Sequence, residues 1–358
     1  MTVNVSKPAI NVREKLAELD KPTGIAGEAM LRAETPQEQF NLIGAGRRNH
    51  VINGDFQVWQ RGTSFTTTFD YTADRWHFSN NLSLSISRQA TPVSENTTGC
   101  KYYMRVEPNG NTHNSTFISF RHKIENVSSI PPSTDCTISF WVRSSQVTKM
   151  RIQLWDLYNN FSAYDLFGQT DIEGISSTWK RVEFTTRSPS RSGTSPVDGA
   201  NMLLIQIQNL STFSGSNTLD ITGVQLEVGK VATPFEHRSY GEELAACLRY
   251  YWQVTKEKAY HNVTNMVAYD SSSAYGTLYY PVKMRTQPTF SHSSDNDFFV
   301  TGQSNNFTPV NMSASEITTW SSQLYGSTNG NYTQGSAYWL RFDSDNPSGQ
   351  FFAFDAEL

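Results

Sequence analysis

The sequence is poor in charge and in cysteine. Only 17% of its 358 residues are charged, and the formal net charge is −4. Without an excess of Lys and Arg there is no electrostatic footprint for nucleic acid, so we expect no nucleic-acid partner. The three cysteines, Cys100, Cys136 and Cys247, are widely spaced and form no Cys-x-x-Cys motif. We expect three buried thiols, with a Cys100–Cys136 disulfide as the alternative.

Long apolar runs are also missing. The longest, "MLLI" at 202–205, is far too short to cross a bilayer. The N-terminal stretch "MTVNVSKPAINVREKLAELD" has no hydrophobic region of the secretory kind. These absences predict a chain that is made in a cytoplasm and does not insert into a membrane.

The sequence motifs of common catalytic sites are absent as well. The histidines lack metal-ligand spacing, and there is no nucleophile elbow and no phosphate-binding glycine loop. Two carboxylate pairs, Asp70 with Asp74 and Asp156 with Asp165, have the chemistry for glycoside cleavage, but no local motif distinguishes them. We therefore expect a protein that is not an enzyme and binds no cofactor or metal. A glycan-cleaving depolymerase is the alternative.

Aromatic residues, in contrast, make up 13% of the chain, and many lie in segments of alternating character. Clear examples are "CTISFWVRSS" at 136–145, "MRIQLWDL" at 150–157 and "MLLIQIQNL" at 202–210. Strict alternation over short segments, separated by loops rich in Ser, Gly, Pro and Asn, is typical of antiparallel strands with one buried face. The sequence thus predicts a mainly β fold.

Residues 1–46 differ from the rest. Val12, Leu16 and Leu19 recur at helical spacing, and "TPQEQFNLIG", which contains Phe40, begins with the signature of a helix N-terminus. Helices this short are marginal alone, so their apolar residues need a partner. We interpret residues 1–46 as a helical anchoring segment in which Val12, Leu16, Leu19 and Phe40 make the contacts.

Three further parts follow the anchor. Residues 47–237 contain the alternating segments and predict a jelly-roll β-sandwich. Ser239 and Glu242 form a capping box, and Leu244, Leu248 and Tyr251 continue an apolar stripe, which predicts a linking helix at 238–254. Residues 255–358 return to strand-like segments such as "GTLYYPVKM" and "QFFAFDAEL", and predict a second β-sandwich.

Several segments carry a resemblance to known families. A domain that begins with "NGDFQVW" and ends with "LDITGVQLE" resembles the carbohydrate-binding jelly-roll modules, in which the first and last strands pair in one sheet. "VQLEVGKVATPFEHRSYGEELAACLRYYWQV", "YYPVKMRTQPTF" and "FDAEL" are similar to recurrent segments of bacteriophage tail-fibre proteins. "INVREKLAELDKPTGIAGEAMLRAETPQEQFNLIGAGRRN" resembles the start of fibre-type virion proteins of short-tailed phages of marine bacteria.

The resemblance implies a virion component of a phage tail, attached to other tail proteins through residues 1–46 and contacting host surface polysaccharide. It also implies a homotrimer. The sequence agrees that a partner is needed, because "QFFAFDAEL" is apolar on both faces and the Tyr-Tyr-Trp cluster is too broad for a solitary helix. The expected interface residues are Leu244, Leu248, Tyr251, Trp252, Phe352 and Phe354. A purely structural virion protein without a ligand is a further alternative.

The strands expected at 136–145 and 150–157 also predict a ligand face. With the even-numbered residues in the core, period-two alternation places the odd-numbered ones on the opposite side. If the two strands form a hairpin, Trp141 lies opposite Gln153 or Arg151, and aromatic rings stand beside groups that bond sugar hydroxyls. The expected ligand residues are Trp141, Arg143, Arg151, Gln153, Trp155 and Tyr158. Packing of this face beneath another segment or subunit is the alternative.

Finally, the jelly-roll resemblance raises the possibility of a structural calcium ion between the first and last strands. Asp55 and Asp220 lie at the two matching ends. Calcium needs six or more oxygen ligands, and only these two carboxylates are available. We therefore expect both to act as turn residues that bond backbone groups.

Overall fold

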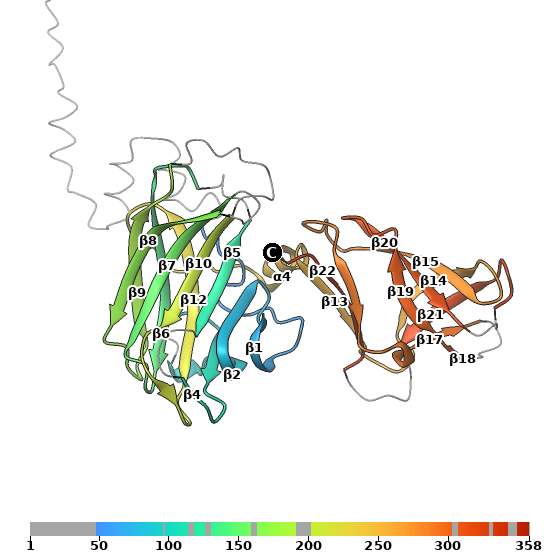
Figure 1. The fold of residues 1–358 in the computed structure, drawn as a ribbon, viewed down its shortest axis with the longest axis horizontal. Helices are drawn as coiled ribbons and strands as arrows, with labels where there is room; N and C mark the ends of the chain where they lie inside the picture. The colour runs from blue at the N-terminus through green and yellow to red at the C-terminus, as the bar shows by residue number, and fades with distance from the viewer. Residues whose placement is uncertain are drawn as a thin grey trace, which may run out of the picture. The chain divides into compact units, whose positions relative to one another are not determined.

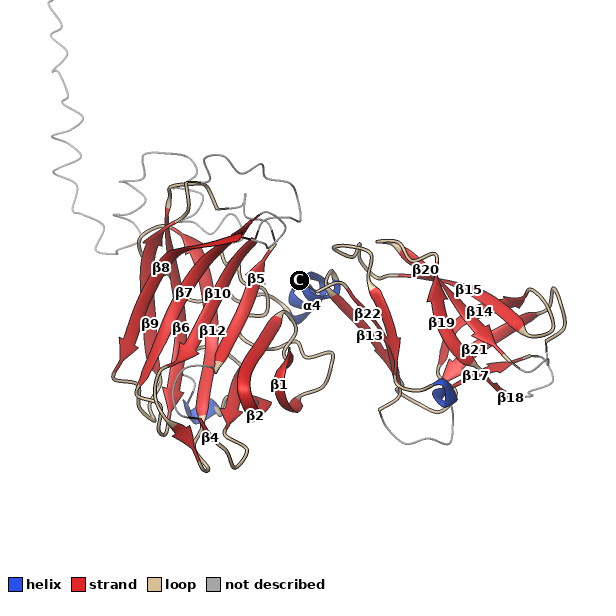
Figure 2. Ribbon diagram, in the orientation of Figure 1, coloured by secondary structure: helices blue, strands red, loops and turns tan. Residues whose placement is uncertain are grey.

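The computed structural model describes residues 48–358 except 96, 114–117, 126–129, 159–162, 191–201, 303–306, 329–331, 343–348 and 358. The anchoring segment expected at 1–46, with Val12, Leu16, Leu19 and Phe40, lies outside the described residues. Residues 49–358 form a compact unit of their own. As predicted, the fold is mainly β, and Figure 2 shows it as strands with little helix. No helix in the described ranges is long and apolar enough to span a membrane.

The first part of this unit is a large antiparallel β-sandwich (Figure 1). Its strands are β1 (Ser64–Tyr71), β2 (Trp76–Ala90), β3 (Tyr102–Glu107), β5 (Ser119–Ile124), β6 (Asp135–Ser144), β7 (Lys149–Tyr158), β8 (Ala163–Glu173), β9 (Lys180–Arg187), β10 (Met202–Asn209) and β12 (Leu219–Val228). They join in the order β8-β7-β10-β5-β2-β3-β12-β6-β9, with β1 on β2. Two short strands, β4 (Thr112–His113) and β11 (Phe213–Ser214), pair separately.

We call strands β5, β10, β7 and β8 layer A, and strands β3, β12, β6 and β9 layer B. The long strand β2 connects the layers, because residues 76–79 pair with β5 and residues 85–90 pair with β3. On the other side, β8 and β9 meet, where the Thr186 hydroxyl donates to the Phe167 carbonyl over 2.9 Å. The sandwich is thus closed along both sides.

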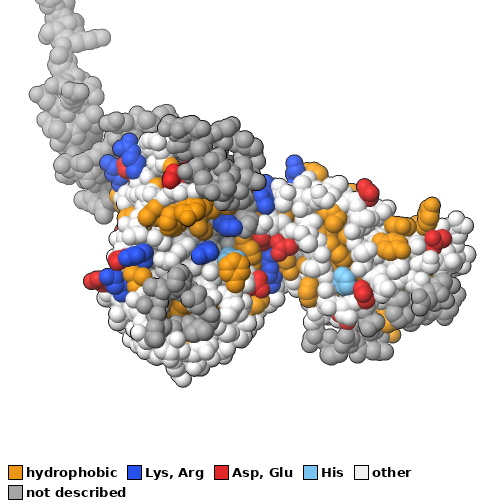
Figure 3. Space-filling view, viewed as in Figure 1, with side chains coloured by type: hydrophobic (Ala, Val, Ile, Leu, Met, Phe, Trp, Pro, Cys, Tyr) orange, Lys and Arg blue, Asp and Glu red, His pale blue; other side chains and the backbone are white. Residues whose placement is uncertain are grey.

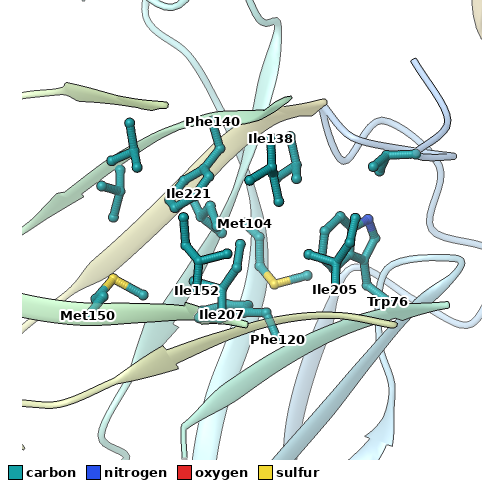
Figure 4. Close-up of a cluster of buried hydrophobic side chains, with 14 of the residues drawn as sticks. Trp76, Met104, Phe120, Ile138, Phe140, Met150, Ile152, Ile205, Ile207 and Ile221 are labelled. Carbon is teal, nitrogen blue, oxygen red and sulfur yellow. The ribbon is translucent and has the colours of Figure 1, made fainter. Parts of the chain in front are cut away.

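The core lies between the two layers (Figure 4). Ile138 and Phe140 of β6 project into it from layer B, and Met150 and Ile152 of β7 project into it from layer A. All four are at most 1% exposed. The even-numbered residues of both strands therefore face the core, as the alternation predicted.

The opening segment 50–59 is not a strand, although it runs beside β12. His50 N donates to the Leu226 carbonyl and Val224 N donates to the Gly54 carbonyl, both over 2.9 Å. Gly54 allows this approach, since a Cβ at this position would lie 2.1 Å from the Val224 oxygen. The expected adjacency of the two ends of the domain is present, without a regular ladder.

The linking helix is shorter than the sequence predicted. Helix α4 covers Tyr240–Leu248, and the predicted capping box is present, with Ser239 N and Glu242 Oε2 2.9 Å apart. The prediction that the helix continues to 254 is wrong, because β13 begins at Tyr251 (Tyr251–Thr255). Aromatic and β-branched residues favour either state locally, and here pairing with β22 selects the strand.

The C-terminal part contains two sheets. Strands β13, β22 (Phe351–Asp355) and β16 (Thr289–His292) form a three-stranded sheet with β22 in the centre. The seven-stranded sheet has the order β18-β17-β21-β14-β15-β20-β19. Its strands are β14 (Asn262–Ala268), β15 (Ser273–Tyr279), β17 (Phe298–Thr301), β18 (Phe307–Pro309), β19 (Asn311–Ser315), β20 (Ser321–Ser327) and β21 (Ala337–Phe342).

Four of the six residues expected at a subunit interface contribute to packing within the chain. Phe352 and Phe354 are at most 1% exposed, and Tyr251 is 6% exposed. Trp252 is half-buried and stacks on Phe354, with ring centroids 5.9 Å apart. The burial of these side chains therefore does not require a second subunit, because Phe352, Phe354 and Trp252 pack in the core of the C-terminal part. Whether they also contact a second subunit stays a prediction. Leu244 and Leu248 of α4 are half-buried.

Candidate functional site

The predicted ligand residues do not form one face. Strand β6 pairs with β12 and β9, so that Trp141 lies opposite Thr222 and Arg181. Strand β7 pairs instead with β8 and β10. The expected hairpin between the two strands is wrong, because the chain crosses from layer B to layer A between them. Trp141 and Arg143 therefore lie on the outer face of layer B, and Arg151, Gln153 and Trp155 lie on the outer face of layer A.

On layer B, Arg143 belongs to a network of ion pairs. Its guanidinium and that of Arg105 both donate to the Asp220 carboxylate at 2.8 Å, and Asp220 is 1% exposed. The Arg143 guanidinium also lies 4.6 Å from the centre of the Trp179 ring. Asp220 thus neutralises two guanidinium groups, a structural role that the sequence did not indicate.

Trp141 on the same layer is half-buried and lies against Gly223 of β12. A Cβ at Gly223 would lie 3.2 Å from both Trp141 Cδ1 and Cys100 Sγ. Gly223 has φ +63°, so the close approach and the backbone conformation both require glycine. Trp141 therefore packs closely on β12, whereas cover of this face by another segment or subunit stays a prediction. All three cysteines are buried free thiols.

On layer A, a row of amide side chains crosses three strands. Gln153 of β7 lies in register with Gln169 of β8 and Gln206 of β10. Gln153 Nε2 donates to Gln169 Oε1 over 2.7 Å, and Gln206 Nε2 donates to Gln153 Oε1 over 3.3 Å. The row continues in register to Arg121 of β5 and His77 of β2. Each amide retains hydrogen-bonding capacity beyond these bonds.

Hydrophobic side chains form the neighbouring row on the same three strands. Trp155 lies in register between Leu166 and Leu204, and its ring meets that of Tyr164 edge to face at 5.6 Å. Tyr164 is 64% exposed. Figure 3 shows hydrophobic side chains gathered on this face beside Lys and Arg side chains. Tyr158 ends β7, but its side chain lies outside the described residues.

A second aromatic group lies at the other end of the row. Phe69 is 65% exposed, and its ring meets His77 edge to face at 4.2 Å. Tyr71 contacts the same imidazole, with ring centroids 5.1 Å apart. Aromatic rings therefore lie beside the amide row and beyond its β10 end.

The cations of this face are only partly neutralised. The Arg151 guanidinium pairs with Asp171 at 2.6 Å, whereas Arg121 Nε has no hydrogen-bond partner among the described residues. Burial lowers the pKa of Arg121, which is the signature of a partly desolvated cation. Burial, followed by the charges of Arg121 and Lys123, lowers the pKa of His77 to about 4. The imidazole is therefore neutral at pH 7.

The carboxylates considered for catalysis lie elsewhere. Asp74 is 1% exposed and accepts a 2.8 Å hydrogen bond from Gln60 N, and Asp70 is exposed on β1. Asp156 lies in register with Asp165, next to the register shift in β7 and β8. Among the described residues, no three His, Cys, Asp or Glu side chains are grouped to hold a metal ion.

Sequence reasoning missed three members of the layer A face, namely Arg121, Gln169 and Gln206. Their positions in alternating segments indicate outward-facing side chains. Their meeting depends on which strands pair, and β5, β7 and β10 are far apart in sequence. Only the sheet order reveals the row.

Comparison with known proteins gives limited matches. No protein-family model matches the chain, and no curated protein matches it significantly. A putative sugar binding protein from Bacteroides thetaiotaomicron VPI-5482 is 13% identical, with a TM-score of 0.36 over 51% of this chain and 100% of that one. A structure titled "CBM4 structure and function" is 15% identical, with a TM-score of 0.29 over 50% of this chain and 99% of that one.

The enzymatically active domain of bacteriophage CBA120 tailspike protein 4 is 13% identical, with a TM-score of 0.32. The match covers 51% of this chain and 21% of that one. At these identities and TM-scores, the likenesses carry no argument about what this chain does, and the function has to be argued from its own residues.

Proposed function

We propose that the protein is a component of a phage tail, similar to tail fibres, whose jelly roll binds host cell-surface polysaccharide on the outer face of layer A. The observation that carries the proposal is the row Gln169–Gln153–Gln206, with Trp155 and Tyr164 beside it on β7 and β8, and with Phe69 and His77 beyond its β10 end. Aromatic rings stack on the apolar faces of sugar rings, and amides both donate to and accept from hydroxyl groups.

The charge of the face suggests the kind of glycan. The half-buried Arg121 forms no ion pair among the described residues, and the Asp171 carboxylate is occupied by Arg151. An arginine of this kind is suited to a carboxylate or phosphate group of a ligand. The preferred ligand is thus an acidic polysaccharide of the host surface.

The sequence resemblance of the N-terminal 46 residues to fibre-type virion proteins supports their role as the tail-attachment segment. The same resemblance supports a homotrimer located in the virion.

The decisive experiment compares Trp155→Ala with Trp141→Ala. Both tryptophans are half-buried, but they lie on opposite layers. We expect Trp155→Ala to weaken adsorption of the labelled protein to host cells by about tenfold, the effect of losing a central binding side chain. Trp141→Ala serves as the matched control and should adsorb as the unmodified protein does.

Stability measurements on the same two variants separate binding from packing. If Trp155 mainly stabilises the fold, its replacement should cost about 3–5 kcal/mol, as for a buried large-to-Ala change. Equal adsorption by both variants, or a loss of adsorption explained by unfolding of Trp155→Ala, would contradict the layer A site.

A glycan-cleaving depolymerase is the second candidate, and one observation favours it. Asp156 and Asp165 are cross-strand partners, and such pairs have Cβ atoms about 4.5–5.5 Å apart. Retaining glycosidases hold their two carboxyl groups about 5–5.5 Å apart. Incubation with host polysaccharide should yield new reducing ends if the pair is catalytic, and Asp165→Asn should abolish them. We expect no release from the unmodified protein.

A further inference from the structure

The seven-stranded sheet of the C-terminal part has one face against its core and one face outside. Met266, Ala274 and Leu324 point into the core and are at most 1% exposed. Their neighbours in sequence form a cross-strand row on the other face, where Val267 lies opposite Tyr275 and Tyr275 lies opposite Tyr325. The neighbouring rings are close, with the Tyr275 and Tyr325 centroids 5.1 Å apart.

An open depression of about 650 Å³ lies at one end of this row. It is lined by Val267, Tyr269, Tyr275, Gln323, Gln334 and Gly335. Tyr269 is 69% exposed and Val267 is 55% exposed, which is unusual for large hydrophobic side chains on one small area. The Tyr269 and Tyr275 rings meet nearly at right angles, at 88°, with centroids 6.0 Å apart.

The backbone around the depression is held in place. Tyr269 N donates to the Ser273 carbonyl over 2.8 Å, and Gly335 N donates to the Ala268 carbonyl over 2.9 Å. Asp270 caps the intervening turn by accepting from Ser272 N at 2.7 Å. The tyrosines are therefore presented on a hydrogen-bonded hairpin, so that little ordering is required on binding.

The polar groups at the depression are uncharged. Its amides belong to Gln323 and Gln334, and none of its lining residues carries a charge. Gln323 Oε1 accepts a 3.3 Å bond from Ser315, which orients the amide. Among the described residues, the hydroxyls of Tyr269 and Tyr275 make no hydrogen bond. The site thus combines two aromatic rings with unused neutral donors and acceptors.

We propose that this depression is a second glycan-binding site, and that it takes a neutral pyranose unit. The edge-to-face tyrosines provide an apolar surface for the C–H face of a sugar ring, and the two amides and two hydroxyls can bond its hydroxyl groups. The absence of charge among the lining residues matches a ligand without carboxylate, phosphate or ammonium groups. This distinguishes the site from the layer A face, where Arg121 favours an acidic glycan.

Native gel electrophoresis of the full chain in gels containing dextran, xylan, mannan or β-1,3-glucan tests the proposal. We expect at least one of these neutral polymers to retard the protein relative to a polymer-free gel. Tyr269→Ala should weaken that retardation by about tenfold, as for a residue at the centre of a binding site. Because Tyr269 is largely exposed, this change leaves the fold intact, and a thermal melt verifies it.

Tyr279→Ala is the matched control, since Tyr279 ends β15, is 74% exposed and is absent from the lining of the depression. It should be retarded as strongly as the unmodified chain, and so should Trp155→Ala. A gel with the anionic polymer alginate reports on layer A separately, where only Trp155→Ala should lose retardation. The second site is refuted if no neutral polymer retards the chain, or if Tyr269→Ala and Tyr279→Ala behave alike.

Discussion

The Glu357 carboxylate forms an ion pair with the Arg75 guanidinium, and both side chains are buried. Arg75 belongs to the turn before β2 of the jelly roll, whereas Glu357 follows β22 of the C-terminal part. The guanidinium also lies over the Tyr250 ring, 3.5 Å from its centre. A neighbouring arginine, Arg61, lies 3.6 Å from the same carboxylate. The segment "FDAEL", which resembles a tail-fibre segment, thus neutralises two arginines of the jelly roll.

This relationship predicts a large effect of Glu357→Gln on stability. The change leaves Arg75 buried without a countercharge, and breaking one partner of a buried ion pair costs about 3–5 kcal/mol. Urea denaturation of the full chain measures the difference in unfolding free energy. Glu257→Gln, at an exposed glutamate, is the control and should change little. Equal effects of the two changes would show that the pair contributes no stability.

Asp55 predicts a pH dependence of stability. Burial, followed by the nearby charge of Glu243, raises the pKa of Asp55 from 3.8 to about 6. The folded chain therefore holds a proton that the unfolded chain has lost between these two values. The stabilisation is complete below pH 3.8 and is lost as the pH rises through 6.

Replacement of Asp55 by Asn tests this linkage. The amide cannot ionise, so Asp55→Asn should be more stable than the unmodified protein at pH 8, by about 2 kcal/mol if most of the shift is realised. The gain should vanish near pH 4. Urea unfolding at the two pH values, with Asp70→Asn as an exposed control, measures it. A gain that is independent of pH would contradict the assignment.

Replacing buried aromatic residues of β13 and β22 by glutamate should impair folding of the C-terminal part and not subunit assembly. Tyr251→Glu together with Phe354→Glu places two carboxylates among buried rings, where an unpaired charge is strongly unfavourable. We expect loss of soluble protein or of cooperative unfolding in the C-terminal part. If circular dichroism and melting are unchanged while light scattering shows a smaller assembly, these residues are interface residues after all.

The sequence predicted the positions of the strands better than it predicted which strands pair with each other. Alternation correctly assigned the core-facing residues of β6, β7 and β10, because one buried face imposes period two on any strand. It could not show that β6 and β7 lie in different layers, since a core-facing residue has the same pattern on either side. The split of Trp141 from Trp155 follows from this limit.

The Tyr250–Tyr251–Trp252 cluster shows a second limit. Its spacing extends the apolar stripe of α4, and the local sequence contains no glycine or proline to end the helix. Pairing of Tyr251 with Asp355, which is far along the chain, decides the conformation. Contacts at long range overrode local propensity there, and periodicity does not contain that information.

Removal of residues 1–46 tests the anchoring role. Residues 49–358 form a compact unit with their own two cores, so we expect the truncated chain to stay soluble and rich in β structure by circular dichroism. It should fail to enter phage particles during complementation of an infection. Normal incorporation of the truncated chain would contradict the anchoring role.

The central position of β22 has a consequence for biosynthesis. Both neighbours of this strand, β13 and β16, are translated well before it, and in the described structure each pairs only with β22. The three-stranded sheet therefore cannot form until β22 has been translated. Arg61 and Arg75 likewise lack the carboxylates of Asp355 and Glu357 until then. A nascent chain that stops before residue 351 therefore exposes the aromatic residues of β13 to aggregation and proteolysis.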